Sequence, residues 1–408
     1  MSFGEALQMA FSTRSAAKVI GGPGLGWFGI GSSSSEGTVA NYKTAFALSA
    51  FYNGVDQISN DIAKLPKSVK RKIGKNREDY SEHPVNYLIS DYPNQMMTSF
   101  DFWKLIIVSM IIKGNGYAEI IRGQNTGRTI SFIHRDSDDV TVYEKDDQLI
   151  YKFKGREIAS DNMLHFKAFS FDGKIGVSII QFAAKQLGVS LDAQEYQSTV
   201  YTDRGMGYGV IESDISVDPD TKKLIEAGFS TKMAQKNKFN VPMLDEGMKY
   251  KSISVSPAEA QFLESNKNGV LEVCRWLNIA PHKLKVLDNS NNANIQHQSI
   301  EHVQDSILRY IIPCEQELKH KLFALKERLS LYVKFNEKVL LRGDLEARKN
   351  YYTALVYAGV MTRNEVRALE DMNPLDGLDE ILQPVNMQAL SLATQLIEQQ
   401  IKDKGNGS

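Results

Sequence analysis

The spacing of apolar positions predicts two helices early in the chain. Between residues 47 and 65, apolar side chains recur every three or four positions, which indicates an amphipathic helix that ends before Pro66. A second helix is predicted over residues 100–113, with Ser99 as its N-cap. Because this second helix is apolar nearly all round, we expect it to be buried.

A β-rich stretch is predicted after the glycines at positions 114 and 116. Strand-like runs separated by turn residues cover residues 117–122, 130–134, 140–143, 149–153 and 163–166. A shorter strand is predicted at residues 67–72, followed by a charged turn over residues 74–79. Helices followed by such a meander are typical of the α+β fold class.

The N-terminal segment has a different composition. Residues 21–37 contain seven glycines and four consecutive serines, so they can bury little apolar surface. We therefore expect a flexible arm over residues 1–39 and a folded part that begins near residue 40.

The second half of the chain predicts two long helices around a small insertion. A long helix over residues 178–204 is followed by a shorter one over residues 218–235 and a strand pair at 239–244 and 249–254. Ser256 and Glu259 form a capping box that begins a helix reaching residue 277. Two long helices that flank a small α/β insertion suggest a stalk with a tip.

Further helices are predicted toward the C-terminus. The first covers residues 295–325 and contains Pro313, which should kink it. A strand at residues 331–335 comes next, then a helix at 344–358 and another that begins at the capping box of Thr362 and Glu365. A last, solvent-exposed helix is predicted over residues 387–402.

A polar hinge separates two of the long helical patterns. Within residues 289–294 there are four asparagines and a serine, whose side chains favour local bonds to the backbone over helix. The hinge is neutral, flexible and rich in hydrogen-bonding groups. Such a loop suits a protein that must present a soft surface to something sliding past it.

Charge and cysteine content narrow the function classes. The 408 residues carry 48 Lys and Arg against 49 Asp and Glu, so no basic nucleic-acid footprint is present. The two cysteines, Cys274 and Cys314, indicate neither a disulfide framework nor a metal site. The longest apolar run, residues 102–112, is too short to span a bilayer. We expect a soluble, intracellular protein with no membrane partner.

No motif for catalysis or cofactor binding stands out. The sequence lacks a P-loop, a GxSxG elbow, an HExxH pair and a kinase signature. His297 and His302 are five residues apart, which places them on different sides of a helix and argues against a metal pair. We expect a protein that is not an enzyme and holds no cofactor or metal.

Several short motifs together resemble the portal (head-to-tail connector) proteins of tailed bacteriophages, in particular the compact Hong Kong ninety-seven-like branch. Examples are His83-Pro-Val-Asn-Tyr-Leu88 and Gly114-Asn-Gly-Tyr-Ala-Glu119. Further matching motifs lie at residues 55–66, 92–94, 97–103, 172–176, 263–265, 279–282, 294–296, 316–318, 341–344, 361–365 and 373–374. Their collinear order over residues 42–376 is far more specific than any single motif.

The resemblance implies a dodecameric ring around a DNA channel and assigns a region of that ring to each segment. Residues 40–176 would form the wing, 177–204 and 255–278 the two stem helices, 205–254 the clip, 279–294 the tunnel loop, 295–342 the long wing helix and strand, and 343–408 the helical crown and tail. The ring would sit at one capsid vertex of the virion after assembly in the host cytoplasm.

The function implied by the resemblance is passive. The ring would let double-stranded DNA enter and leave without reading its sequence, and would bind the large terminase, major capsid and scaffold proteins and the head–tail adaptor. The DNA-channel residues would be Lys283, Lys285, Asn289, Ser290, Asn291, Asn292 and Asn294. The clip contacts between subunits would involve Phe239, Val241, Met243 and Leu244.

Two other interpretations remain open. The hinge could be a surface connection that contacts nothing. The protein could instead be a sequence-specific DNA-binding regulator that uses a helix-turn-helix near residues 361–372, although the missing basic surface argues against it. A gel-shift with operator-like DNA distinguishes the regulator from the portal.

Overall fold

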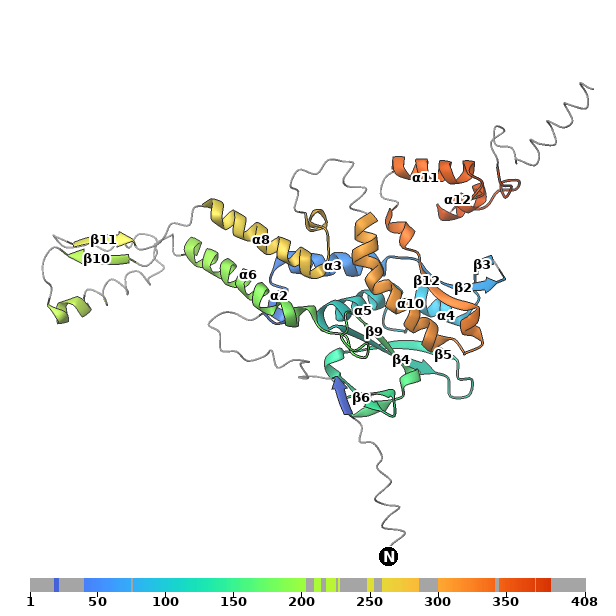
Figure 1. The fold of residues 1–408 in the computed structure, drawn as a ribbon, viewed down its shortest axis with the longest axis horizontal. Coiled ribbons are helices and arrows are strands. Elements are labelled where there is room, and N and C mark those ends of the chain that lie inside the picture. Colours follow the sequence, from blue (N-terminus) through green and yellow to red (C-terminus); the bar gives the residue numbers. More distant parts are fainter. Residues whose placement is uncertain are drawn as a thin grey trace, which may run out of the picture. The chain divides into compact units, whose positions relative to one another are not determined.

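The computed structural model describes residues 18–21, 40–74, 76–202, 209–213, 218–224, 227, 248–252, 259–285, 300–341, 345–370 and 372–382. The chain divides into two compact units, residues 1–335 and 336–408. Both helices and strands are present, as the α+β prediction requires (Figure 1). The predicted segments 239–244 and 387–402 lie outside the described residues.

The first unit is built around the buried helix α5 (Ser99–Lys113). Its Phe102, Trp103 and Ile106 are completely buried, which confirms the expectation from its apolar sequence. Helix α3 (Ser49–Ala63) packs against it. The predicted cap was wrong by one residue, because Thr98 accepts the N-terminal bond from the Asp101 amide. Ser99 instead donates its hydroxyl to the Ile89 carbonyl at 2.6 Å.

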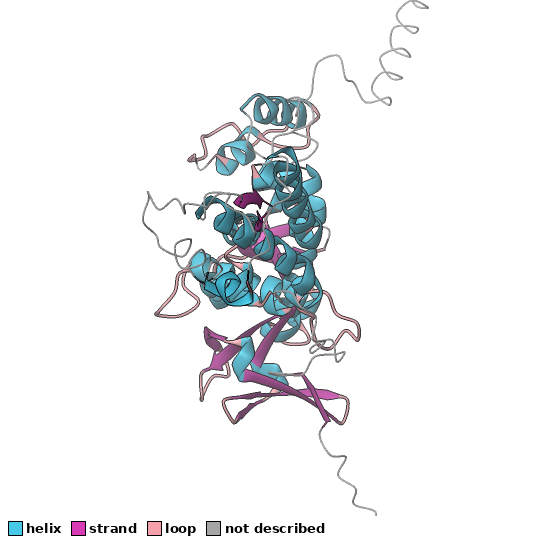
Figure 2. Ribbon diagram, turned by 90° about the vertical axis from the view of Figure 1, so that its left-hand side faces the viewer, coloured by secondary structure: helices cyan, strands magenta, loops and turns pink. Residues whose placement is uncertain are grey.

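Two antiparallel sheets account for the predicted β-rich stretch. In the first, β4 (Asn115–Arg122) lies between β5 (Thr129–Arg135) and β9 (Met163–Lys167). The second has the order β1-β6-β7-β8, formed by Lys18–Gly21, Val140–Lys145, Gln148–Phe153 and Arg156–Ile158. Figure 2 shows the strands of these sheets gathered on one side of the helices of this unit.

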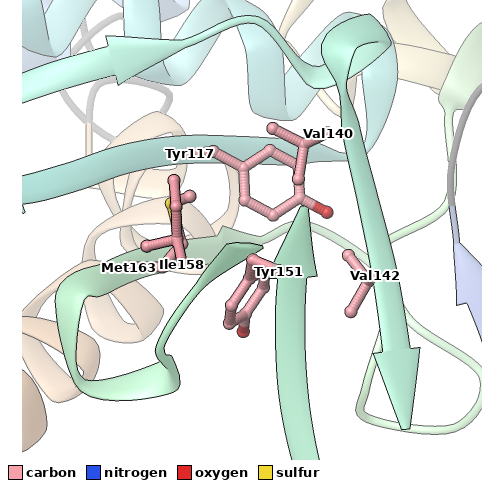
Figure 3. Close-up of a cluster of buried hydrophobic side chains, with 6 residues drawn as sticks. All are labelled: Tyr117, Val140, Val142, Tyr151, Ile158 and Met163. Atoms are coloured by element: carbon pink, nitrogen blue, oxygen red, sulfur yellow. The ribbon is translucent and has the colours of Figure 1, made fainter. Parts of the chain in front are cut away.

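A compact apolar cluster joins the two sheets. Tyr117 of β4 and Met163 of β9 meet side chains of the second sheet (Figure 3). The partners from the second sheet are Val140, Val142, Tyr151 and Ile158. Strand β1 was not predicted, and its pairing with β6 corrects the expectation that the folded part begins near residue 40.

A third sheet brings distant segments together. Strand β2 (Lys67–Ile73) lies between β12 (Leu331–Phe335) and β3 (Asn76–Asp79). The predicted strands 67–72 and 331–335 are thus confirmed. The charged turn predicted over residues 74–79 was wrong, because Asn76–Asp79 pairs with β2 after a left-handed Gly74 (φ 60°).

The two predicted long helices lie side by side. Helix α6 (Ile179–Thr202) packs against α8 (Glu259–Leu277), and both extend toward a two-stranded antiparallel sheet of β10 and β11 (Figure 1). Strand β11 (Met248–Ser252) matches the predicted strand 249–254. Its described partner is β10 (Gly209–Ser213), which was not predicted.

The long helix predicted over residues 295–325 is not regular. A π-helix, η4 (His302–Ile307), precedes α10 (Leu308–Leu322), which contains Pro313. The departure from α-helical geometry therefore lies upstream of the proline. Other described elements of this unit include α2 (Tyr42–Ala45), α4 (Pro84–Ser90), and the short helices η1 (Ser137–Asp139), η2 (Ser160–Asn162), η3 (Pro281–Leu284) and η5 (Glu327–Leu329).

The second unit contains η6 (Glu337–Leu341), α11 (Leu345–Tyr357) and α12 (Arg363–Leu369). Thr362 and Glu365 form the predicted capping box at the start of α12. Glu370 accepts a bond from Arg348 at 2.8 Å and from the Tyr352 hydroxyl at 2.7 Å, which ties the end of α12 to α11.

Two glycine motifs meet where α5 ends and α6 begins. Gly114 is left-handed (φ 79°), and an added Cβ would lie 2.4 Å from the carbonyl carbon of Val177. The buried Asn115 side chain closes the contact: its amide donates to the Gly176 carbonyl at 2.8 Å and its oxygen accepts from the Gly176 amide at 2.7 Å. This junction fixes the direction in which α6 leaves the core.

Replacing Gly114 by alanine should therefore destabilise the protein strongly. We expect Gly114→Ala to lower the free energy of unfolding by about 3 kcal/mol, because left-handed strain and a backbone clash add. Gly74→Ala is the matched control, since Gly74 is also left-handed but an added Cβ has nothing within 4 Å. It should cost only about 1–2 kcal/mol. Equal losses in urea unfolding would contradict the close-approach argument.

Candidate DNA-channel loop and its anchors

The predicted channel residues fall mostly outside the described part of the chain. Only Lys283 and Lys285 are described among them. The other predicted loop residues, Asn289, Ser290, Asn291, Asn292 and Asn294, lie outside it, as do the clip residues Phe239, Val241, Met243 and Leu244. The structure does describe both ends of the segment 286–299, and these ends form the candidate site.

The N-terminal end of the segment 286–299 follows a short helix, η3, that packs on α3. After α8, Asn278 adopts a left-handed conformation (φ 52°), and η3 then runs to Lys285, which is also left-handed (φ 64°). Leu277 and Leu284 lie over Gly54 of α3, where an added Cβ would be 2.3 Å and 3.5 Å from their methyl carbons. A residue without a side chain is needed at position 54 for this approach.

The trailing end is the π-helix η4. Its His302, Val303, Ser306 and Ile307 are buried. Single π-helical turns inside α-helices are rare and often occur at functional sites. Here the π-helix begins three residues after the segment 286–299, so it is the buried element that follows the C-terminal end of that segment.

Hydrogen bonds connect the two ends directly. The Ser306 hydroxyl donates to the Asn278 carbonyl, and the Asn278 side-chain amide donates to the Asp305 carbonyl at 3.1 Å. The side-chain amide and the backbone carbonyl of Asn278 thus both bond to the facing π-helix. The ends of the segment 286–299 are therefore held at a fixed separation.

A buried carboxylate attaches this clamp to α3. Asp61 is only 2% exposed and accepts from His302 Nε2 at 2.9 Å, from Gln57 Nε2 at 3.0 Å and from Lys64 Nζ at 2.5 Å. Burial raises the pKa of Asp61, but the hydrogen bonds from His302, Lys64 and Gln57 outweigh it and hold the pKa well below its usual range. Asp61 is therefore ionised at neutral pH.

The cations directly before the segment 286–299 are lysines. Lys283 is half-buried and Lys285 is exposed. Burial lowers the pKa of His282, and the nearby Lys283 and His302 lower it further, so His282 stays neutral at neutral pH. This end of the segment can offer phosphates two point charges from Lys283 and Lys285, with no contribution from the neighbouring imidazole.

Sequence reasoning missed Asp61, His302 and Asn278. Asp61 and His302 are 241 positions apart, so no local pattern connects them. One signal was present, because Asp61 lies in the same helical stripe as Gly54, Ile58 and Leu65. A carboxylate within an apolar stripe indicates a buried, partnered charge.

Other expectations can be compared with the described residues. Cys274 and Cys314 are free and buried, so they form no disulfide. Within the described ranges, no three His, Cys, Asp or Glu side chains are grouped to hold a metal ion. In that same part of the chain, no helix combines the length and apolarity needed to cross a membrane.

The sequence matches a known family along most of its length. The family described as "Phage portal protein" matches residues 49–371. The chain is 26% identical to the "Portal protein" of Enterobacteria phage HK97, over 83% of this chain and 82% of that protein. It is 27% identical to the "Probable portal protein" of Streptomyces phage phiC31, over 86% and 81% of the two chains.

Solved structures share the fold. A HK97 family phage portal protein from Corynebacterium diphtheriae superposes with a TM-score of 0.58 at 14% identity, covering 76% of this chain and 99% of that chain. A chain from the neck of a native gene transfer agent particle, computed with C12 symmetry, gives a TM-score of 0.56 at 19% identity, covering 91% and 99%.

Removing the Asp61 charge should loosen the clamp in a pH-dependent way. At pH 7, Asp61→Asn should lower the free energy of unfolding by about 2 kcal/mol, since hydrogen bonds to an ionised carboxylate are lost. The pKa of Asp61 is depressed on folding, so its stabilisation is present above the unfolded pKa, near 3.8, and is lost as pH falls below that value. The difference between wild type and variant should shrink below about pH 4.

Asp56→Asn is the matched control on the same helix. Asp56 pairs with Lys104 at 2.7 Å, and both side chains are about one third exposed. Its replacement should cost less than about 1 kcal/mol. Urea unfolding of both variants at pH 7 and below pH 4 makes the comparison, and a pH-independent effect of Asp61→Asn would contradict the role of its charge.

Proposed function

Because this chain belongs to the phage portal protein family, we propose that it forms a dodecameric ring around the DNA channel at one capsid vertex. Family membership follows from the match over residues 49–371. The ring is supported by the similar fold of chains in gene transfer agent necks computed with C6 and C12 symmetry. A ring of identical chains with a head-to-tail interface closes at a fixed number of copies.

One observation carries the channel proposal: a neutral polar loop on rigid ends. The segment 286–299 contains the Asn- and Ser-rich hinge, and its ends are clamped by Asn278 with Ser306 and by Asp61 with His302. Amide and hydroxyl groups hydrogen-bond to phosphates, but they lack the charges that dominate DNA affinity. Such a loop can line a channel and contact DNA without gripping it.

We assign the other segments from the resemblance of the chain to portal proteins. Helices α6 and α8 form the stem, and residues 205–254 form the clip at its end. Residues 40–176 form the wing, and residues 343–408 form the crown. The clip docks the large terminase during packaging and the head–tail adaptor afterwards, whereas scaffold and major capsid proteins contact the ring during assembly. The terminase supplies the energy for packaging, and the portal itself performs no catalysis.

The regulator alternative gains no support from the second unit. Helix α12 has seven residues, and its two arginines bind the chain's own backbone. Arg363 donates to the Gly377 carbonyl at 3.2 Å, and Arg367 donates to the Asn373 carbonyl at 2.8 Å. Recognition helices instead direct such side chains at base edges and phosphates.

The clip should contribute contacts between subunits. Residues 205–254 are too few to bury a core alone, so apolar positions such as Phe239, Val241, Met243 and Leu244 need partners. We expect Val241→Asp to reduce ring formation in sizing chromatography while the circular dichroism of the protein is retained. Thr221→Asp, at an exposed position of the same insertion, is the matched control and should leave rings intact. Equal loss of folding and assembly in Val241→Asp would contradict a clip interface.

Lysines in the hinge should make the channel grip DNA. Replacing Asn291, Asn292 and Asn294 together by Lys should raise the DNA affinity of the isolated ring and steepen its salt dependence, because each new phosphate contact releases counterions. Repeated in every subunit, this grip should slow or stall packaging. The measurements are DNA packaged per capsid and DNA binding at two salt concentrations.

The same three residues replaced by Ala provide the control. An exposed loop contributes little to stability, so the Ala variant should assemble normally. If the Lys variant binds DNA no better and packages normally, the hinge does not face the channel.

A further inference from the structure

A basic cavity lies on the third sheet of the first unit, away from the loop anchors. It has a volume of about 520 Å³ and is lined by residues of β2, β3, β12, α10 and η5. Five of its seven lining residues are cationic: Lys72, Arg77, Lys319, Arg328 and Lys334. The other two are Leu329 and Tyr332, so the lining contains no carboxylate. Such a concentration of charge is unexpected in a chain with a net charge of −1.

Most of these cations have no counterion within the described ranges of the chain. Lys334 pairs with Glu315 at 3.2 Å, and Arg328 uses Nε to donate to the Phe323 carbonyl. Lys72, Arg77 and Lys319 have no carboxylate partner among the residues that the structure describes. Like charges held this close repel one another, so binding of an anionic ligand would reduce the unfavourable electrostatic energy of the cavity.

Apolar side chains flank the charges. Leu329 is 86% exposed at the cavity, and the nearby Leu325 is 76% exposed. A leucine side chain is not stabilised by contact with phosphates, but its burial against apolar side chains of a protein segment is favourable. The cavity therefore fits an acidic peptide segment with apolar residues better than it fits DNA.

The second unit carries a segment of that chemistry. Residues 375–382 have the sequence Leu-Asp-Gly-Leu-Asp-Glu-Ile-Leu, with the exposed carboxylates Asp376, Asp379 and Glu380. Its Leu375, Ile381 and Leu382 are exposed as well. Within the described part of the chain, none of the three carboxylates forms an ion pair. The carboxylates of the segment thus complement the cations of the cavity, and its apolar side chains complement the leucines beside it.

This segment is held in shape by a buried asparagine. Asn364 donates to the Leu375 carbonyl at 2.9 Å, accepts from the Leu375 amide at 3.0 Å and donates its backbone N–H to the Leu378 carbonyl at 3.3 Å. A loop fixed before binding loses less entropy when it docks.

We propose that in the ring the acidic segment 375–382 of one copy docks into the basic cavity of a second copy. This inference rests on the proposed ring, and it names one interface of it. A head-to-tail ring needs two different surfaces on each chain, and the cavity and the segment are such a pair. Ion pairs at the rim would fix register and orientation, while Leu325 and Leu329 would be covered by the apolar residues of the segment.

Disulfide trapping between separate chains tests the docking. A tagged Lys72→Cys chain is mixed with an untagged Asp379→Cys chain under mild oxidation. The native Cys274 and Cys314 are buried and should not react. We expect a tagged–untagged dimer on a non-reducing gel, strongly reduced at about 1 M salt, where screening is short-ranged. Lys154→Cys, an exposed lysine of another sheet, replaces Lys72→Cys as the control and should give no product.

Electron microscopy of the same samples separates the possible failures. Rings without the tagged–untagged product would overturn the docking and leave the ring proposal standing. Absence of both rings and product would overturn both.

Charge reversal provides an independent readout. Asp379→Lys with Glu380→Lys should reduce ring formation, and adding Lys72→Glu with Arg77→Glu should restore it, because the pairs are then reversed. A folding defect would not be rescued in this way. If the cavity variant instead lowers DNA affinity and does not restore assembly, the cavity binds nucleic acid and the docking proposal is wrong.

Discussion

The burial of most of helix α5 determines the architecture of the first unit. Its Trp103 lies 5.0 Å from the Phe335 ring and 5.7 Å from the Phe166 ring, and its indole donates to the Ile89 carbonyl. Burying each large apolar side chain contributes about 1.5–3 kcal/mol. A helix this apolar cannot stay at the surface, so α3, β4 and β12 cover most of it. The positions of the other elements follow from this packing.

Helix α3 connects the buried helix α5 to the candidate site. One of its faces packs on α5, and it also carries Gly54 and Asp61, to which the two ends of the segment 286–299 attach. The ends of the segment 286–299 are fixed by buried contacts that do not depend on the sequence of the segment. The contacts that hold these ends are therefore separate from the DNA contacts that we propose for the hinge.

The sequence predicted the strongly patterned elements well and the weakly patterned ones poorly. The buried helix at residues 100–113, the strand at 331–335 and the capping box at Thr362 all have local signals that the structure confirms. Strand β3 is missed because its four residues are exposed and polar, and only its pairing with β2 makes it a strand. The π-helix and the Asp61–His302 contact depend on tertiary partners. The clamp was therefore beyond prediction, and the polar hinge predicted between its ends lies outside the described residues.

The central claim is that identical copies of this chain assemble into a ring whose hole is lined by the segment 286–299. Cryo-electron microscopy of the purified full-length protein, averaged without imposed symmetry, tests it most directly. We expect a closed ring with a central hole, twelve-fold like the C12 symmetry of the gene transfer agent neck, and with the ends of η3 and η4 facing that hole. A uniform population of monomers, or a ring whose η3 and η4 ends face outward, would contradict it.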